Sequence, residues 1–254
     1  MSRTDGALRV KPVMGILGAG RLGMVLARLA VGAGYQVLIA GSGDPKRIAL
    51  PIDVLANGGA ATTVADAAER ADVVILALPL GRYRSIPVDA LAGKLVIDAM
   101  NYWWTADGLL AEFSDPLRSS SEVVQNHLSA SRVVKAFNHM GYTDLEEEAR
   151  PPGQAGRKAI GIAADDTNDL DLVAGIVDDV GFDPVRVGRL ADGVRLEPGT
   201  EPFGADVDSA ELEAMIDRFP RSQRGLRRAA ALAGGTTPER TPGTGRPEQG
   251  SRSG

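Results

Sequence analysis

The sequence has no cysteine, only two histidines and few aromatic residues. Without cysteine the chain forms no disulfide, thiolate metal site or thiol nucleophile, and two histidines leave little for a metal centre, so we expect no bound metal. Reactive chemistry must then come from a bound cofactor or from carboxylates. The net charge of −5 argues against a nucleic-acid binder, which would need a basic face.

Long apolar segments are missing as well. No run of about 18 apolar residues is present that could cross a bilayer. Residues 1–11 lack the apolar core of a signal peptide. We therefore expect a cytoplasmic protein that has no membrane partner.

Short apolar runs do recur along the chain, with helix-length segments between them. Buried parallel strands have this appearance, because helices cover both faces of their sheet. One helix is expected over residues 120–128, where Ser119 and Glu122 have capping-box spacing. The pattern predicts a doubly wound, mostly parallel α/β sheet, whose ligands bind at the carboxyl ends of the strands. The expected strands are residues 13–17, 37–40, 73–78, 95–97, 133–136, 159–163 and 184–187.

The first run leads directly into a G-x-G-x-x-G turn and then into an amphipathic helix. Gly18 can make the tight turn, Gly20 lets the backbone approach a pyrophosphate, and Gly23 lets the helix pack closely on the strand. The phosphates would face the helix N-terminus, where N–H groups and the helix dipole favour anions. The turn predicts a dinucleotide site formed by Gly18, Ala19, Gly20, Arg21, Leu22 and Gly23.

The residues after the second run bear on the choice between NAD and NADP. An NAD site carries an acidic residue about 20 residues past the glycine turn, whereas cationic groups accommodate the 2′-phosphate of NADP. Ser42 can donate to that phosphate, and Lys46 and Arg47 follow within one turn. Asp44 is the competing evidence, but its place before Pro45 is typical of a helix N-cap. The local charge favours NADP.

Two further strand ends carry distinctive residues. Leu78 and Pro79 close the third run, where the proline ends the strand and turns the chain over the site. The loop after the fourth run contains Tyr102, Trp103 and Trp104, which include both tryptophans of the chain. These rings either wall a pocket for a flat ligand or anchor a subunit contact in a homodimer, and the sequence leaves both open.

The fifth run ends at Ala136, and Asn138 and His139 follow it. An extended dinucleotide would place its nicotinamide half near this strand end. His139 is therefore the candidate catalytic residue, as a hydrogen-bond donor or an acid. The alternative is a histidine whose hydrogen bonds are satisfied by nearby backbone.

We divide the chain into an N-terminal segment (1–12), a dinucleotide-binding domain (13–205), a C-terminal loop-plus-helix extension (206–233) and a tail (234–254). The extension begins with a helix near Asp208, which has capping-box spacing to Glu211, and Pro220 interrupts it. The tail has no aliphatic or aromatic residue. We expect it to be disordered, because it cannot bury enough apolar surface to offset its ordering entropy.

The pattern as a whole resembles the NADPH-dependent reductases of the deazaflavin coenzyme known as factor 420. The similarity covers roughly residues 13–203. It is carried by the glycine turn, by Gly41 and Ser42, by the strand that ends in Pro79 and most specifically by the Lys-Ala-Phe-Asn run ending at Asn138.

The resemblance implies a Rossmann-type domain that binds NADP(H), with a deazaflavin as second substrate. It assigns the 2′-phosphate to Ser42 and Arg47, and it places hydride transfer near His139. Leu78, Pro79, Ala136 and Asn138 complete the expected cofactor site. The sequence departs from the family pattern at Gly43, where the family carries arginine, and in the aromatic loop.

Hydride transfer between two stacked rings needs positioning more than acid–base catalysis. This requirement agrees with a chain that offers no obvious catalytic dyad. We therefore predict an NADP-dependent oxidoreductase that moves a hydride between NADP(H) and a small-molecule redox acceptor, for which a deazaflavin is the candidate. Two alternatives stay open, an NADPH-dependent imine or ketone reductase and a non-catalytic NADP(H)-binding regulator.

Overall fold

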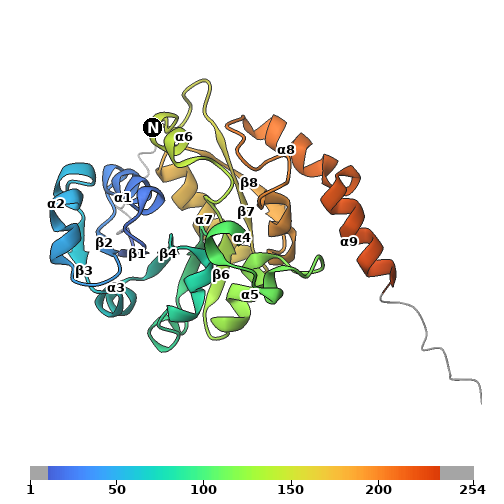
Figure 1. Cartoon of the computed structure of the whole chain (residues 1–254). Coiled ribbons are helices and arrows are strands. Elements are labelled where there is room, and N and C mark those ends of the chain that lie inside the picture. Colours follow the sequence, from blue (N-terminus) through green and yellow to red (C-terminus); the bar gives the residue numbers. More distant parts are fainter. Residues whose placement is uncertain (1–10, 235–254) are drawn as a thin grey trace, which may run out of the picture.

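The computed structural model describes residues 11–234, whose centre is an eight-stranded sheet with helices on both faces (Figure 1). The strand order is β3-β2-β1-β4-β5-β6-β7-β8. The first six strands in this order are parallel, and β7 runs antiparallel to β6 but parallel to β8. The predicted doubly wound, mostly parallel sheet is confirmed. The strands are β1 (Met14–Leu17), β2 (Val37–Ala40), β3 (Ala60–Thr62), β4 (Val73–Leu76), β5 (Leu95–Asp98), β6 (Arg132–Lys135), β7 (Ala159–Ala163) and β8 (Asp183–Gly188).

All seven apolar runs form strands, and the structure adds one that the sequence did not predict. This is β3, which pairs with β2 at the sheet edge and consists of two alanines and a threonine that are exposed or half-buried. An edge strand of three small residues leaves no apolar run to detect. Only its pairing partner distinguishes it from a loop.

Helices connect the strands and carry the expected caps. The Ser119 hydroxyl accepts the Glu122 N–H at 3.2 Å, and the Glu122 carboxylate accepts the Ser119 N–H at 2.7 Å, which confirms the capping box. The α-helices are α1 (Arg21–Gly32), α2 (Lys46–Leu55), α3 (Val64–Arg70), α4 (Trp104–Asp107), α5 (Ser120–His127), α6 (Tyr142–Glu147), α7 (Thr167–Asp179), α8 (Ser209–Arg218) and α9 (Gln223–Gly234). Short 3-10 helices are η1 (Leu80–Ser85), η2 (Asp89–Leu91), η3 (Ala111–Phe113), η4 (Leu190–Leu196) and η5 (Phe219–Arg221).

The apolar core lies in layers on the two faces of the sheet. In β1, Met14 and Ile16 belong to the cluster that also contains residues of α1 and α7, whereas Leu17 belongs to the cluster on the face of α3 and α5. A smaller third cluster joins Leu212 and Ile216 of α8 to β7 and β8. Successive side chains along each strand therefore pack into the core layers on opposite faces of the sheet. Strands that are covered on both faces appear in the sequence as continuous apolar runs.

The C-terminal helices cover the β7–β8 end and then leave the body of the protein (Figure 1). Asp208 caps α8 by accepting the Glu211 N–H at 2.9 Å, while the Glu211 carboxylate pairs with Arg218 instead of completing a capping box. Pro220 lies in η5, which separates α8 from α9 as expected. The predicted disordered tail lies outside the described residues except for Gly234.

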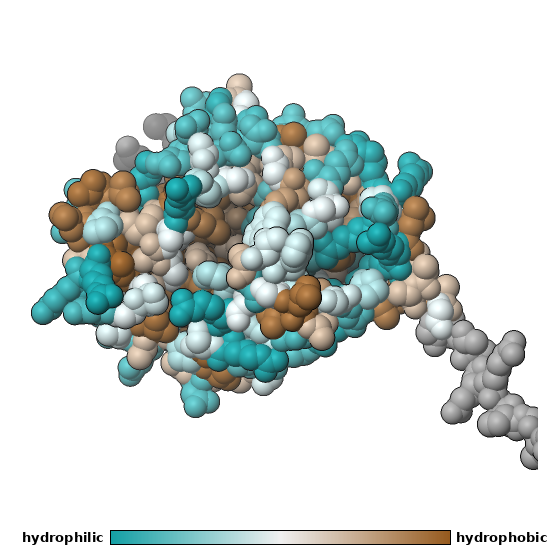
Figure 2. Space-filling model, in the orientation of Figure 1, coloured by the Kyte–Doolittle hydropathy of each residue, from teal (hydrophilic) through white to brown (hydrophobic). Residues whose placement is uncertain are grey.

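An apolar patch lies over α2, where Leu50, Val54 and Leu55 are exposed (Figure 2). No helix in residues 11–234 combines the length and apolar character needed to span a membrane. Over the same range, no cluster of three or more acidic or histidine side chains is arranged to hold a metal ion.

Candidate functional site

A pocket of about 370 Å³ opens at the carboxyl ends of β1, β2 and β4. Its walls come from the glycine turn, the end of β2, the start of α2 and α3, and the segment from β4 through η1. Parallel sheets bind their ligands at this edge, so the pocket lies where the predicted dinucleotide site should be. Six of the predicted cofactor residues line it, namely Gly18, Ala19, Gly20, Ser42, Leu78 and Pro79.

The three glycines of the turn have distinct roles. Gly18 has φ of +125°, and a Cβ there would lie 2.2 Å from the carbonyl oxygen of Ala77. A Cβ on Gly23 would lie 1.8 Å from the carbonyl oxygen of Gly18, so helix and turn are in close contact. By contrast, apart from Gly20 itself and its two neighbours in the chain, no described atom lies within 4 Å of the position that a Cβ on Gly20 would take. Gly18 and Gly23 serve the fold, and Gly20 leaves its side open.

The N-terminus of α1 lies at this open space, and among the described residues no side chain occupies the place that an anion would take. Gly20 is its N-cap, and among the described residues no side chain caps it and no acidic residue lies in its first turn. Unpaired N–H groups and the helix dipole make such an end a binding site for anions.

The end of β2 resolves the competing interpretations of Asp44. The Oδ1 atom of Asp44 accepts the Lys46 N–H at 2.9 Å, and the Asp44 carbonyl accepts the Arg47 N–H at 3.0 Å. Asp44 therefore caps α2, as expected from its place before Pro45. Lys46 and Arg47 are exposed, and neither forms an ion pair within residues 11–234. Two unpaired cations thus follow Ser42 within five residues of the chain, although neither Lys46 nor Arg47 is among the pocket's lining residues.

The structure adds a cation that the sequence analysis missed. Arg82 of η1 lines the pocket, is exposed and forms no ion pair in the part of the chain that the structure describes. The Ser85 hydroxyl donates to the Arg82 carbonyl at 2.8 Å and so stabilises η1. The only sequence signal was the proximity of Arg82 to Pro79, because a 3-10 helix has no periodic apolar pattern.

Apolar side chains form the remaining wall of the pocket. Ile48 comes from α2, Val64 from the start of α3, and Ile86 follows η1. Each of them was unremarkable in the sequence, because aliphatic residues are most often part of the core. Together they offer flat apolar surface beside Ser42 and Arg82.

Four other predicted cofactor residues lie away from the pocket. Arg21 donates to the Tyr142 hydroxyl at 2.6 Å and so turns towards α6. Leu22 packs against the core, and Ala136 is buried in it. Asn138 is buried, and its amide donates to the Asn101 side-chain oxygen at 3.0 Å and to the Leu196 carbonyl at 2.7 Å. These contacts bind one part of the chain to another.

His139 lies in the interior, next to β7. Its Nε2 accepts the Gly161 N–H at 3.0 Å, and only 1% of the residue is exposed. Burial lowers the pKa of His139 to about 4, an effect that the Pro202 carbonyl offsets only in part. The side chain is therefore neutral near pH 7. Backbone thus satisfies Nε2, whereas the buried Nδ1 has no hydrogen bond of good geometry within residues 11–234, and the fold does not bring His139 to the pocket.

A buried ion pair joins the last residues of β5 and β6. The Lys135 ammonium lies 3.3 Å from Asp98 Oδ2 and donates to the Met100 carbonyl at 2.6 Å. Asp98 also accepts the Ser121 hydroxyl at 2.6 Å and the Met100 N–H at 2.9 Å. Lys135 and Asp98 are both fully buried, so every charge here is used internally. This network fixes the start of the aromatic loop.

The aromatic loop is connected to the pocket through Asp107. Its Oδ1 accepts the Gly81 N–H of η1 at 2.9 Å, and its Oδ2 accepts the Trp103 N–H at 2.8 Å. The Trp103 ring meets the Phe203 ring edge to face at 5.6 Å, and its residue is 47% exposed. Trp104 is more exposed still, so the loop presents two indoles next to η1.

Comparison with known proteins supports the prediction for the N-terminal part of the chain. Residues 13–102 match the family model described as NADP oxidoreductase, coenzyme F420-dependent. The resemblance predicted from the sequence is confirmed over this segment, which contains the glycine turn, Ser42 and Arg82. YjhV of Escherichia coli (strain K12) is 34% identical over 85 residues, which are 34% of this chain and 60% of that protein.

Two solved structures share the fold over most of the chain. A hypothetical protein of Sinorhizobium meliloti, SMa0349, is 27% identical with a TM-score of 0.66, over 78% of this chain and 93% of that one. A protein of Arthrobacter sp. FB24, proposed to be an F420-dependent NADP-reductase, is 20% identical with a TM-score of 0.62, over 88% and 96% of the two chains. The second likeness is one of fold alone.

Proposed function

We propose that this protein is an NADP(H)-dependent oxidoreductase that transfers a hydride between the nicotinamide and a second small-molecule acceptor. The observation that carries this proposal is the charge arrangement of the pocket. The open side of Gly20 lies at an uncapped helix N-terminus, and Ser42 lines the pocket together with the unpaired cation Arg82, while Arg47 follows Ser42 by five residues in the chain. The acidic residue that would mark an NAD site, Asp44, is already used as a helix cap.

The residues present fit a dinucleotide with an extra phosphate. The turn from Gly18 to Gly20 would hold the pyrophosphate on the N–H groups of α1, because a Cβ on Gly20 would fill that space. Ser42, Arg47 and Arg82 would hold the 2′-phosphate, and Arg82 offers a planar guanidinium suited to bidentate contact. The aliphatic wall of Ile48, Val64 and Ile86 would pack against the adenine.

The bound nicotinamide would supply the hydride chemistry, and the protein would orient the ring and exclude water. A carbonyl or imine substrate requires a proton donor, whereas transfer between two ring systems requires mainly alignment. The family match over residues 13–102 favours a ring acceptor over an imine or a ketone.

A deazaflavin is the acceptor that we propose. The support is the family match over residues 13–102 and the two exposed indoles next to η1, which offer flat apolar surface for stacking. A non-catalytic NADP(H)-binding regulator would bind NADPH but transfer no hydride to any acceptor.

The test measures NADPH and NADH affinity by fluorescence titration and then hydride exchange between NADPH and an oxidised deazaflavin. We expect NADPH to bind at least about tenfold more tightly than NADH, because of the charge on its 2′-phosphate. Ser42→Ala and Arg82→Gln should each weaken NADPH binding and leave NADH binding unchanged.

Arg227→Gln is the matched control, because Arg227 is an exposed arginine of α9 that is not among the pocket's lining residues. Equal binding of NADH and NADPH would overturn the assignment of Ser42, Arg47 and Arg82. Tight NADPH binding without exchange on any acceptor would favour the regulator.

A further inference from the structure

A second, smaller pocket of about 100 Å³ lies at the N-terminus of α5. Tyr102 and Phe113 come from the loop after β5, Arg118 and Ser120 from the start of α5, and Glu197 from the segment after η4. Because α5 leads from β5 to β6, its N-terminus lies at the same sheet edge as the dinucleotide pocket. The two pockets share no lining residue.

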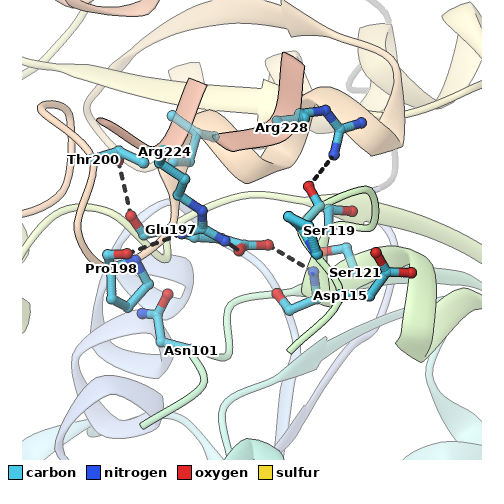
Figure 3. Close-up of polar contacts among 12 residues, drawn as sticks. Asn101, Asp115, Ser119, Ser121, Glu197, Pro198, Thr200, Arg224 and Arg228 are labelled. Carbon is cyan, nitrogen blue, oxygen red and sulfur yellow. Dashed lines mark hydrogen bonds and ion pairs between the residues drawn. The ribbon is translucent and has the colours of Figure 1, made fainter. Parts of the chain in front are cut away.

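Glu197 already occupies part of this helix end. It is 5% exposed, and its Oε1 accepts the Ser120 N–H at 2.7 Å. Its Oε2 accepts a hydrogen bond from the guanidinium of Arg224, which also donates to the Pro198 carbonyl at 2.9 Å (Figure 3). Arg224 therefore neutralises the charge of Glu197, and both carboxylate oxygens have partners.

Two groups of the pocket remain without partners. Ser120 is only 6% exposed, and its buried hydroxyl has no hydrogen-bond partner among residues 11–234. Arg118 is half-buried and forms no ion pair in the described part of the chain. Buried polar groups are normally hydrogen-bonded, so an unpartnered hydroxyl beside an unpaired guanidinium indicates a missing ligand.

The charges define what that ligand would be. The pocket is lined by two guanidinium groups, Arg118 and Arg224, and by one carboxylate, Glu197, so one positive charge has no counterpart among the lining residues. The N-terminal dipole of α5 adds to the attraction for an anion. A volume of about 100 Å³ admits a group of only a few heavy atoms.

We propose that this pocket binds a small oxyanion group, a carboxylate or a phosphate. Arg118 supplies the charge through its guanidinium, and the Ser120 hydroxyl donates one hydrogen bond. Glu197 and Arg224 form the fixed back of the site. The oxyanion is either a free ion or the acidic group of a larger molecule, such as the redox acceptor, bound along the same sheet edge.

The first experiment needs no cofactor and no turnover. Inorganic phosphate and, separately, acetate are titrated into the full chain by isothermal calorimetry, with the ionic strength held constant by chloride. We expect saturable binding of at least one of them. Arg118→Gln should weaken it at least about tenfold and Ser120→Ala about threefold, since a contact with the charged group exceeds one neutral hydrogen bond.

Arg227→Gln is the matched control, and it should bind the anion like the natural chain. NADPH affinity should be unchanged in all three variants, so that failure here is distinguishable from failure of the proposed cofactor site. Thermal unfolding of each variant without anion checks that the fold is intact. Absence of saturable binding, or equal binding by Arg118→Gln and Arg227→Gln, would overturn the proposal.

A second experiment separates the two sources of the oxyanion. If the group belongs to the acceptor, phosphate raises the apparent KM for that acceptor in the natural chain and not in Arg118→Gln. If the ligand is a free ion, phosphate leaves this KM unchanged while it still binds. Both results support an oxyanion site and assign its ligand.

Discussion

The two halves of the sheet's carboxyl edge use polar residues in opposite ways. At the ends of β1, β2 and β4, Arg47 and Arg82 have no ion pair in the described chain, and Gly20 leaves backbone exposed. At the ends of β5 and β6, Lys135 and Asp98 are fully buried and paired with each other. The first half leaves charges available to a ligand, and the second, apart from Arg118, uses them to hold the chain.

This difference has consequences for what each substitution should do. A residue whose partners are all internal contributes to the free energy of unfolding, because its removal leaves a buried group unsatisfied. A residue without internal partners contributes to ligand affinity, and its removal costs the fold little. Substitutions of internally paired residues should therefore lower stability, whereas substitutions of unpaired residues should weaken ligand binding.

The largest effect is expected for Lys135→Met. It leaves the Asp98 carboxylate buried without its cation, which costs about 3–5 kcal/mol of unfolding free energy. Urea denaturation followed by circular dichroism measures this loss. The double variant Lys135→Met/Asp98→Asn should lose less than the single one, since no unpaired charge stays buried. An equal or greater loss in the double variant would refute this account.

Gly18→Ala and Gly20→Ala test the same distinction between stability and binding within one turn. Alanine at Gly18 must adopt φ of +125° and avoid the Ala77 carbonyl, so we expect a loss of at least about 1–3 kcal/mol in unfolding free energy. Alanine at Gly20 meets no described atom, so stability should stay the same while NADPH binds about tenfold more weakly. Denaturation and NADPH titration distinguish the two, and equal destabilisation would contradict the assigned roles.

Acid should destabilise the protein through His139. Burial lowers its pKa from 6.5 to about 4, so between these values the unfolded state binds a proton that the native state does not. This contribution to stability is complete above pH 6.5 and is lost as the pH falls towards 4, at up to about 1.4 kcal/mol for each pH unit.

The measurement for His139 is urea denaturation at a series of pH values. His139→Gln should flatten the profile between pH 6.5 and 4, even if it lowers stability at neutral pH. Unchanged hydride transfer at the optimum in a folded variant would agree with its position away from the pocket. An identical slope in both proteins would show that other groups cause the acid effect.

The smallest effect is expected for Asp44→Ala. Loss of the α2 cap should cost about 1 kcal/mol of unfolding free energy. NADPH should bind as tightly as before or somewhat more tightly, because a negative charge near the proposed 2′-phosphate site disappears. Thermal unfolding and NADPH titration measure the two effects. If NADPH binding weakened instead, Asp44 would be a ribose ligand.

The sequence predicted those parts of the fold that depend on local pattern. The apolar runs of β2 and β7 give their exact bounds, and the spacing of Ser119 and Glu122 gives the capping box. The edge strand β3 was not predicted, because its pairing with β2 and not its composition makes it a strand. The reversal of β7 relative to β6 is likewise a property of the assembled sheet.

The candidate site was predictable only where a contact follows from its own segment. Gly18, Gly20, Ser42 and Pro79 each lie within three residues of a strand end, and all four line the pocket. Arg82 could not be assigned, since its role depends on how the folded chain brings η1 to the same pocket as the glycine turn and Ser42. Asn138 and His139 also follow a strand end, but partners from distant segments turn them inward.

By itself, then, the sequence determined the glycine turn, the strand ends and the absence of thiol chemistry, because backbone geometry and residue type act locally. The tertiary structure decided which charged and polar groups form hydrogen bonds or ion pairs within the chain. Asp44 caps a helix, Lys135 pairs with Asp98 and His139 accepts from Gly161, whereas Arg82 and Arg118 keep their charges unpaired among the described residues. Burial and long-range pairing set the free energy of a charge, and only the folded chain brings those partners together.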